Sequence, residues 1–289
     1  MAIERIAVVG SGTMGSGIAQ VAAQSGYRVH LVDAVQGQVE VALRNVRRSL
    51  DRAVEKGRIS VADRAEALDR LTTSAQLSDV AASDLVIEAI VEDFETKSNL
   101  LRQLDGLCRP ETLFASNTSS ISITRLAAVT HRPGQVIGMH FFNPVPVMRL
   151  VEVIRGIDTS DDTRARVLQL AQAMGKTAVE VEDYPGFVSN RLVMPMINEA
   201  VYALMEGVAS RESIDTVMKL GMNHPMGPLE LADLIGLDVC LHIMKVLHEG
   251  LGDDKYRPCP LLVKMVAAGR LGRKSGQGFY EYPETNPSR

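Results

Sequence analysis

Three glycines interrupt the first apolar run of the chain, and an acid closes the next one. The turn reads Gly10-Ser-Gly12-Thr-Met-Gly15, and Asp33 follows Gly15 by eighteen residues. Gly10 permits a tight turn after a strand, Gly12 lets the backbone approach a pyrophosphate, and Gly15 allows the next helix to pack closely. That helix would direct its positive end at the phosphates, and Asp33 would accept hydrogen bonds from ribose hydroxyls. The spacing predicts a dinucleotide site; the alternative is a glycine-rich turn with a helix-capping acid.

A histidine and a glutamate occur in two successive apolar segments further along the chain. His140 ends one segment and precedes a loop restricted by Pro144 and Pro146, and Glu152 lies in the middle of the next segment. An acid in an apolar strand is costly to bury unless it is paired. A carboxylate bonded to one imidazole nitrogen would orient the ring for proton transfer. The two residues predict an acid–base pair; the alternatives are a structural histidine and a strand face that meets solvent.

Hydroxyl side chains and an amide follow the apolar run Leu113–Ser116, in Ser116-Asn117-Thr118-Ser119-Ser120. Ligands of open parallel sheets bind at the carboxyl ends of the strands. These side chains are therefore expected to contact a nicotinamide ribose and a substrate oxygen. The alternative is that they cap a helix expected over Ile121–Leu126.

Basic residues recur every four positions in one predicted helix and so share one of its faces. They are Arg44, Arg48, Arg52 and Lys56. Such a face can hold phosphates, but it can equally be a solvated helix surface, and Asp51 and Glu55 dilute its charge.

Strand-like and helix-like segments alternate as far as Asp183 and then give way to helices. The expected strands are 5–9, 27–33, 84–88, 113–116, 135–140, 150–154 and 177–181, and the main expected helices are 35–57, 61–71, 94–107 and 162–174. The pattern predicts an α/β fold, with a doubly wound Rossmann-type sheet over residues 1–184 and a helical insertion at 35–71. Residues 185–283 are expected to form an all-α domain and residues 284–289 a disordered tail. Asn190, beside Gly186 at the start of that domain, suits a cleft between domains.

The composition excludes several classes of protein. The chain has 289 residues, 46% of them hydrophobic, and a net charge of −4, which gives no electrostatic support for nucleic-acid binding. Its three cysteines are widely spaced and lack any CxxC motif, so reduced thiols in a cytoplasmic protein are expected rather than disulfides or a metal site. The sequence has no run of about 18 apolar residues, so neither an export signal nor a membrane partner is expected.

Eight motifs occur in order between Ile6 and Tyr282. They are GSGTMG, VIEAIVED, SNTSS, GMHFFNPVPVM, LVEV, DYPGFVSNR, NHPMGPLELADLIGLD and GRKSGQGFYEY. In these motifs the chain resembles the L-3-hydroxyacyl-CoA dehydrogenases, and among them the single-function bacterial 3-hydroxybutyryl-CoA dehydrogenases. The resemblance implies NAD as cofactor, an acyl-CoA substrate and no metal.

The resemblance also implies roles for individual residues. The implied catalytic residues are Ser119, His140, Glu152 and Asn190. Together with the glycine turn, the expected cofactor contacts are Gly10, Ser11, Gly12, Thr13, Met14, Gly15, Asp33, Glu92, Lys97, Asn117, Ser119, Asn143 and Lys274. The expected substrate contacts are Ser49, Arg52, Lys56, Ser119 and Asn190.

Three alternatives share parts of this pattern. A dehydrogenase of the 6-phosphogluconate type has the same domain order, but a resemblance to it would imply an active site built on a lysine. A relative that acts on a sugar acid such as gulonate could keep the His140–Glu152 pair. A non-catalytic NAD-binding structural protein of the crystallin kind would not need that pair.

Two further expectations concern cofactor choice and assembly. Asp33 would repel the 2′-phosphate of NADP, so NAD is expected to be preferred. The apolar helical stretches Leu192–Leu204 and Leu229–Leu237 lie in a domain of about a hundred residues, which offers little interior to bury them. A homodimer through this domain is therefore expected.

Overall fold

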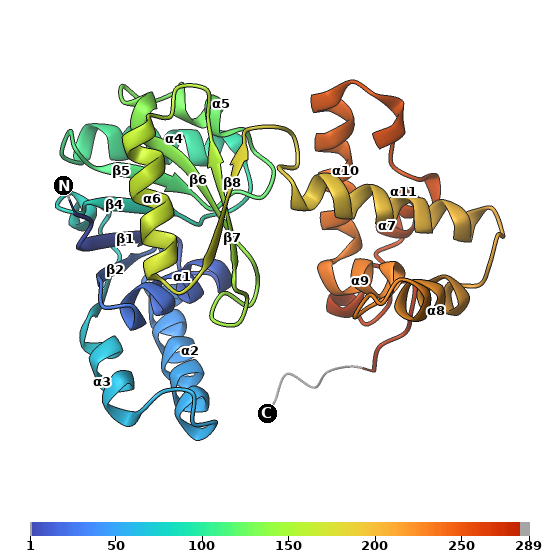
Figure 1. The fold of residues 1–289 in the computed structure, drawn as a ribbon, viewed down its shortest axis with the longest axis horizontal. Coiled ribbons are helices and arrows are strands. Elements are labelled where there is room, and N and C mark those ends of the chain that lie inside the picture. The colour runs from blue at the N-terminus through green and yellow to red at the C-terminus, as the bar shows by residue number, and fades with distance from the viewer. Residues whose placement is uncertain (1, 284–289) are drawn as a thin grey trace. The chain divides into compact units, whose positions relative to one another are not determined.

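The computed structural model describes residues 2–283, and the chain divides into two compact units between Tyr184 and Pro185 (Figure 1). The first unit consists of a sheet with helices on both faces, and the second unit is helical. The tail expected at residues 284–289 lies outside the described residues. Among residues 2–283, no helix has the length and apolar character needed to cross a membrane.

Within the described residues, eight strands form one sheet in the order β3-β2-β1-β4-β5-β6-β7-β8. The strands are β1 (Arg5–Val9), β2 (Arg28–Val32), β3 (Leu71–Ser74), β4 (Leu85–Glu88), β5 (Leu113–Ser116), β6 (Val136–Phe141), β7 (Leu150–Arg155) and β8 (Thr177–Glu182). Strands β1 to β6 run parallel, β7 runs antiparallel to β6, and β8 is parallel to β7. This confirms the expected α/β class. The order reverses between β1 and β4, where open sheets of this kind bind their ligands.

The helices of the first unit cover both faces of the sheet. They are α1 (Thr13–Gln24), α2 (Gln36–Glu55), α3 (Val61–Asp69), α4 (Phe94–Leu107), α5 (Ile123–Ala127) and α6 (Asp161–Ala173). Alternate residues of the strands, such as Ile6 and Val8, share one buried core with side chains of α1 and α6. Helices α4 and α5 cover the opposite face (Figure 1). Because side chains alternate along a strand, each strand contributes to both layers.

The structure corrects two expectations in this unit. The helical insertion ends at Asp69, and Leu71–Ser74 forms the edge strand β3, paired in parallel with β2. The helix expected over Ile121–Leu126 is α5, which begins at Ile123 because the Ser122 hydroxyl caps it by accepting from the Arg125 amide.

The second unit is a bundle of helices with its own buried core. Its helices are α7 (Ser189–Met205), α8 (Arg211–Gly221), α9 (Pro228–Ile235), α10 (Leu237–Leu251) and α11 (Pro260–Ala267). The stretch expected as one helix over Leu229–Leu237 is divided between α9 and α10. Gly236 separates them, because its φ of 106° lies outside the helical range. Short 3₁₀ helices occur at Leu77–Val80, Pro133–Gln135, Asp254–Tyr256 and Arg273–Ser275.

Candidate active site

The glycine turn leaves open space at the start of α1. Gly10 has a φ of 103°, and a Cβ atom there would lie 2.5 Å from the carbonyl oxygen of Ala89. A Cβ atom at Gly15 would overlap the carbonyl oxygen of Gly10, so the turn can form only with glycine at both positions. A Cβ atom at Gly12, by contrast, would meet nothing within 4 Å. Open space beside the first amides of a helix suits a pyrophosphate.

Asp33 lies just past the end of β2, and its carboxylate is held by the glycine turn. Its Oδ2 accepts from the Ser11 amide and hydroxyl, each at 2.8 Å, and its Oδ1 accepts from the Val35 amide at 3.1 Å. Burial alone would raise the pKa of Asp33, but these hydrogen bonds lower it below its usual value. Asp33 is therefore an oriented, ionised carboxylate at the point where the motif expects a ribose.

A cavity of about 710 Å³ joins these residues to an apolar wall. Gly10, Gly12 and Asp33 line it, and so does Gln38. The wall consists of Val9, Val32, Ala34, Ala75, Leu77, Ala89, Ile90, Val91 and Leu100. A polar end beside a helix start and a broad apolar wall fit the ribose and the adenine ring of a dinucleotide.

Four polar side chains form a row on the α4–α5 face, at the carboxyl ends of the parallel strands. The row consists of Glu88 on β4, Ser116 on β5, His140 on β6 and Glu152 on β7. Glu88 is paired with Ser116 across β4 and β5, and His140 with Glu152 across β6 and β7. The neighbours of these residues along each strand, such as Ile87 and Met139, point into the opposite core. Strand alternation and register thus place four polar groups on one side of the sheet.

His140 and Glu152 contact each other directly. The Nδ1 atom of His140 lies 2.8 Å from Oε2 of Glu152, and the two residues are 8% and 2% exposed. The ring of Phe142 packs beside the imidazole with ring centres 4.6 Å apart. This is the pairing that the sequence predicts for the two residues. A buried carboxylate on one ring nitrogen orients an imidazole for proton transfer through the other.

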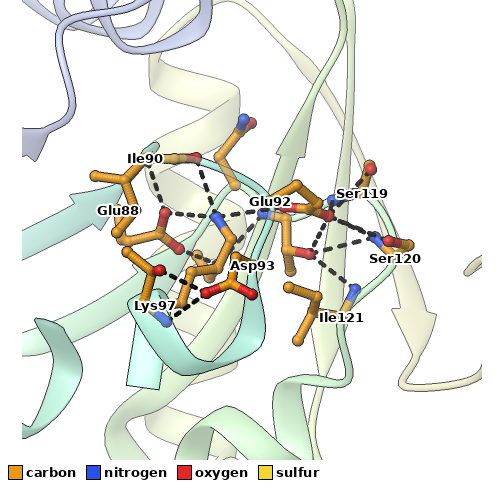
Figure 2. Close-up of polar contacts among 12 residues, drawn as sticks. Glu88, Ile90, Glu92, Asp93, Lys97, Ser119, Ser120 and Ile121 are labelled. Carbon is orange, nitrogen blue, oxygen red and sulfur yellow. Dashed lines mark hydrogen bonds and ion pairs between the residues drawn. The ribbon is translucent and has the colours of Figure 1, made fainter. Parts of the chain in front are cut away.

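A second buried cluster joins the ends of β4 and β5 (Figure 2). The Nζ atom of Lys97, in the first turns of α4, lies 2.6 Å from Oε1 of Glu88 and 3.3 Å from Oε2 of Glu92. Both Lys97 and Glu88 have side chains only 1% exposed. The sequence expects Lys97 to contact the cofactor, but the structure places its ammonium group in this buried ion pair. Two carboxylates around one ammonium group satisfy its charge away from water.

The polar segment after β5 is organised by Glu92 rather than by the following helix. Oε1 of Glu92 accepts from the Thr118 hydroxyl at 2.6 Å and from the Ser119 amide at 2.8 Å. The Ser119 hydroxyl also lies 3.2 Å from this oxygen. The capping alternative is therefore wrong for Ser119, since Ser122 caps α5.

Two expected cofactor contacts, Asn117 and Asn143, are connected with the end of β6. Oδ1 of Asn117 accepts from the Phe141 amide at 3.0 Å, so Asn117 joins the ends of β5 and β6. Asn143 lies in the loop after β6 and precedes Pro144 through a cis peptide bond.

The basic face of α2 opens onto a cavity of about 510 Å³. Its lining includes the expected substrate residues Ser49, Arg52 and Lys56, together with Arg48 and Arg58. Asp51 does not neutralise this face, because its carboxylate pairs with Arg64 at 2.6 Å. Within residues 2–283, no carboxylate forms an ion pair with the four basic side chains that line the cavity. Concentrated positive charge in a hollow suits a phosphorylated ligand.

A loop held by a buried lysine closes one side of this cavity. Nζ of Lys176 donates to the carbonyl oxygens of Val145 at 2.6 Å and Met148 at 2.8 Å. Burial lowers the pKa of Lys176. Between the two carbonyls lie Pro146 and Val147, which line the cavity. Lys176 has no motif around it, and only the folded structure connects it with the loop.

Two expected site residues belong to the second unit. Asn190 lies in the first turn of α7. Lys274 pairs with Asp238 at 2.7 Å. Their roles toward cofactor and substrate stay predictions.

Sequence reasoning misses the contact between Glu88 and Ser116: it gives Glu88 no role and expects Ser116 to contact a nicotinamide ribose or a substrate oxygen. The sequence gives a weak indication of this contact. Each of the two residues is polar and ends a short strand whose other three residues are apolar. A buried acid at such a position requires a partner elsewhere in the fold.

Comparisons with known proteins agree with this geometry. Residues 5–184 match the family model for the NAD binding domain of 3-hydroxyacyl-CoA dehydrogenase, and residues 186–282 match the model for its C-terminal domain. The chain is 57% identical to a probable 3-hydroxybutyryl-CoA dehydrogenase of Bacillus subtilis over 98% of this chain and 99% of the relative. It is 51% identical to a 3-hydroxybutyryl-CoA dehydrogenase of Bradyrhizobium diazoefficiens, over 99% of this chain and 97% of the relative.

A solved structure shows the same likeness. The crystal structure of an (S)-3-hydroxybutyryl-CoA dehydrogenase from Ralstonia eutropha superposes with a TM-score of 0.96 at 52% identity, over 98% of this chain and all of that one. The two family models together span nearly the whole chain. The chain therefore belongs to the 3-hydroxyacyl-CoA dehydrogenase family and is an NAD-binding oxidoreductase.

Proposed function

We propose that this enzyme interconverts L-3-hydroxybutyryl-CoA and acetoacetyl-CoA, with NAD⁺ and NADH as the redox pair. The observation that carries the proposal is the buried contact of 2.8 Å between His140 and Glu152 at the carboxyl end of β6. The four-carbon acyl group is taken from the relatives named 3-hydroxybutyryl-CoA dehydrogenases.

His140 is the general base of the oxidation. It removes the proton from the 3-hydroxyl group and returns it in the reduction. Glu152 orients the imidazole through Nδ1 and stabilises the imidazolium that forms. NAD, when bound, would supply C4 of its nicotinamide ring as the acceptor or donor of the hydride.

Ser119 and Asn190 hold the 3-oxygen and position the acyl chain. The Ser119 backbone and hydroxyl are oriented by Glu92, which supports this role because a fixed donor needs no reorganisation during the reaction. Asn143 and Lys274 complete the nicotinamide side of the site. Glu92 acts there through its contacts with the Ser119 segment, and Lys97 acts through its contact with Glu92.

The cavity on α2 holds the phosphates of coenzyme A. Ser49, Arg52 and Lys56 are the proposed contacts, together with Arg48. The adenosine of NAD occupies the other cavity, with its ribose on Asp33.

Turnover assays test the reaction directly. The purified protein should oxidise NADH with acetoacetyl-CoA, followed by absorbance at 340 nm, and should reduce NAD⁺ with L-3-hydroxybutyryl-CoA. L-gulonate with NAD⁺ is the comparison substrate. Faster turnover of gulonate than of the acyl-CoA would contradict the proposed substrate, and no turnover of either would indicate a structural NAD-binding protein. Longer 3-oxoacyl-CoA substrates then define the preferred chain length.

The second unit is the proposed dimerisation domain. It exposes large apolar side chains, among them Leu192, Leu220, Met222 and Leu234. A single bundle leaves these groups in water, and a second copy would cover them. Light scattering at micromolar concentration should therefore give twice the mass of the chain, and a monomer mass would contradict the proposal.

The cysteines favour a reducing compartment. Cys108, Cys240 and Cys259 are buried free thiols. Burial raises the pKa of Cys108 to about 11 and that of Cys240 to about 12, which suppresses reactive thiolate. We place the protein in the cytoplasm, and cell fractionation with immunodetection checks this.

A further inference from the structure

A buried carboxylate, Glu88, begins a chain of polar contacts that ends at Ser119 (Figure 2). Every oxygen of Glu88 is engaged. Its Oε1 accepts from the Lys97 ammonium at 2.6 Å and from the Ile90 amide at 2.8 Å, and its Oε2 accepts from the Ser116 hydroxyl at 2.5 Å. The three bonds come from the end of a strand, a loop amide and a helix side chain. Because they approach from different elements, they hold the carboxylate in one orientation.

Lys97 is the middle of the chain of contacts. Its Nζ atom lies between Oε1 of Glu88 and Oε2 of Glu92, at 2.6 and 3.3 Å. Burying an ammonium group is costly unless carboxylates surround it with good geometry. The shorter contact is to the more buried acid, so Glu88 sets where the ammonium group lies and the ammonium group in turn attracts Glu92.

Glu92 is the end of the chain that faces the proposed site. One oxygen, Oε2, faces Lys97, while the other, Oε1, accepts from Thr118 and Ser119. Burial alone would raise the pKa of Glu92, but the Lys97 charge and these hydrogen bonds lower it. The side chain is 30% exposed, so without Lys97 it could turn toward water and release the segment. Its position depends on the ammonium group that Glu88 fixes.

We infer that Glu88 is a positioning residue for the proposed reaction, acting through Lys97 and Glu92 to fix Ser119 where the 3-oxygen of the acyl-CoA binds. The inference rests on the proposed function, because Ser119 matters only if this site performs that reaction. Glu88 itself touches no substrate. A displacement of reacting groups by about 1 Å can lower a rate by roughly 100-fold, so a residue remote from the substrate can limit turnover.

A double-mutant cycle tests the inference. The variants are Glu88→Gln, Ser119→Ala and the two combined, with kcat for acetoacetyl-CoA reduction measured at saturating NADH. Glu88→Gln keeps the shape and removes the charge. It should lower kcat about 10- to 100-fold in the otherwise wild-type protein. In the Ser119→Ala background the same substitution should lower kcat less than about threefold, because the group that it positions is already gone.

Asp105→Asn is the matched control. Asp105 lies on the same helix α4, its side chain is 5% exposed, and its carboxylate also pairs with a cation, Arg132, at 2.6 Å. Its other two bonds, to the His131 amide and the His131 ring, lead to the amino-terminal edge of the sheet. The control should lose thermal stability as Glu88→Gln does and keep its kcat at a temperature where both are folded.

A milder variant keeps the test decisive if Glu88→Gln does not fold. Ser116→Ala removes the hydroxyl that binds Oε2 of Glu88 and leaves all three charges in place. It should lower kcat about three- to tenfold, again only when Ser119 is present.

The outcomes separate this inference from the function on which it rests. Suppose that the wild-type protein turns over acetoacetyl-CoA. If Glu88→Gln then lowers kcat equally with and without Ser119, or lowers it in neither case, the inference is wrong and the proposed function stands. No turnover by the unchanged chain would overturn the proposed function and the inference with it.

Discussion

Both units of the protein bury carboxylates, but they give them different partners. In the first unit, Glu88 and Glu152 contact the side chains of Lys97 and His140, at the carboxyl ends of the parallel strands. In the second unit, Asp215 and Asp233 accept mainly from backbone amides and tyrosine hydroxyls. A carboxylate that binds an imidazole or an ammonium group can change that group's protonation or position near neutral pH. One that binds amides and tyrosine hydroxyls fixes the path of the chain instead.

The acids of the second unit hold the segment Phe279–Tyr282 against two helices. Asp215, on α8, accepts from the Leu229 amide at 2.9 Å and from the Tyr280 hydroxyl at 2.8 Å. Asp233, on α9, accepts from the Phe279 and Tyr280 amides, each at 2.9 Å. Burial raises the pKa of Asp233 in spite of these bonds, whereas the pKa of Glu92 in the first unit is lowered. Burial outweighs the hydrogen bonds at Asp233, whereas the Lys97 charge and the hydrogen bonds together outweigh burial at Glu92.

The largest expected effect is on the His140–Glu152 pair. His140→Gln removes the proposed base and should lower kcat about 10²- to 10⁴-fold, while NADH still binds. Glu152→Gln keeps the shape and removes the charge, so it should also lower kcat and change the pH–rate profile. Steady-state kinetics and NADH fluorescence titration measure both. Near-normal turnover of His140→Gln would show that the proton travels through Ser119 or water instead.

Asp215→Ala tests the other side of the comparison. It leaves the buried Leu229 amide without its acceptor, so we expect unfolding free energy to fall by about 2–4 kcal/mol. The kcat of the folded variant should stay unchanged. Chemical denaturation and kinetics at a temperature below the transition give the two numbers. A hundredfold loss of kcat in fully folded protein would remove the distinction between the two kinds of buried acid.

Asp33 sharpens the comparison, because it accepts from amides and is nevertheless expected to bind a ligand. The unchanged enzyme should prefer NADH over NADPH roughly 100-fold in kcat/KM, about 2.7 kcal/mol, since a 2′-phosphate would lie against the Asp33 carboxylate. Asp33→Ala should remove most of this preference. Equal kcat/KM for NADH and NADPH in the wild-type protein would show that Asp33 does not bind the adenosine ribose.

The smallest effect is expected at the exposed basic cavity of the first unit. Arg52→Glu should raise KM for acetoacetyl-CoA about two- to fivefold, the equivalent of roughly 0.5–1 kcal/mol, and the difference should shrink as salt is added. KM for NADH should not change. Arg47→Glu, on the same helix but outside the cavity lining, is the control. Equal KM changes in both variants would mean that α2 presents only a solvated face.

Local patterns are sufficient to predict the parts of the site that are local in structure. The glycine turn and Asp33 need only a strand, a turn and a helix in order, and the structure forms them as expected. The contact of His140 with Glu152 is also predictable, because the two segments are joined by a short loop. The register that sets them side by side across antiparallel strands comes from the sheet as a whole.

The remainder depends on contacts between segments far apart in sequence. The edge strand β3 has one apolar residue in Leu71-Thr-Thr-Ser74, and its conformation follows from pairing with β2. Lys97 resembles any polar residue of an amphipathic helix, since its burial depends on Glu88 in another element. For the same reason Lys176 shows no sign in sequence of the loop that it holds.

Helix α1 limits which substitutions this protein can accept. Gly12, the residue just before α1, lines the cavity beside Asp33, and the far end of α1 lines the basic cavity through Gln20 and Gln24. Between them, a Cβ atom at Gly17 would lie 2.9 Å from Cβ of Val145, in the loop that flanks the basic cavity. Any larger residue at position 17 must therefore displace that loop. Helix α1 thus lies between both cavities, so a substitution in it that reshapes the proposed NAD cavity is also expected to reshape the proposed coenzyme A cavity.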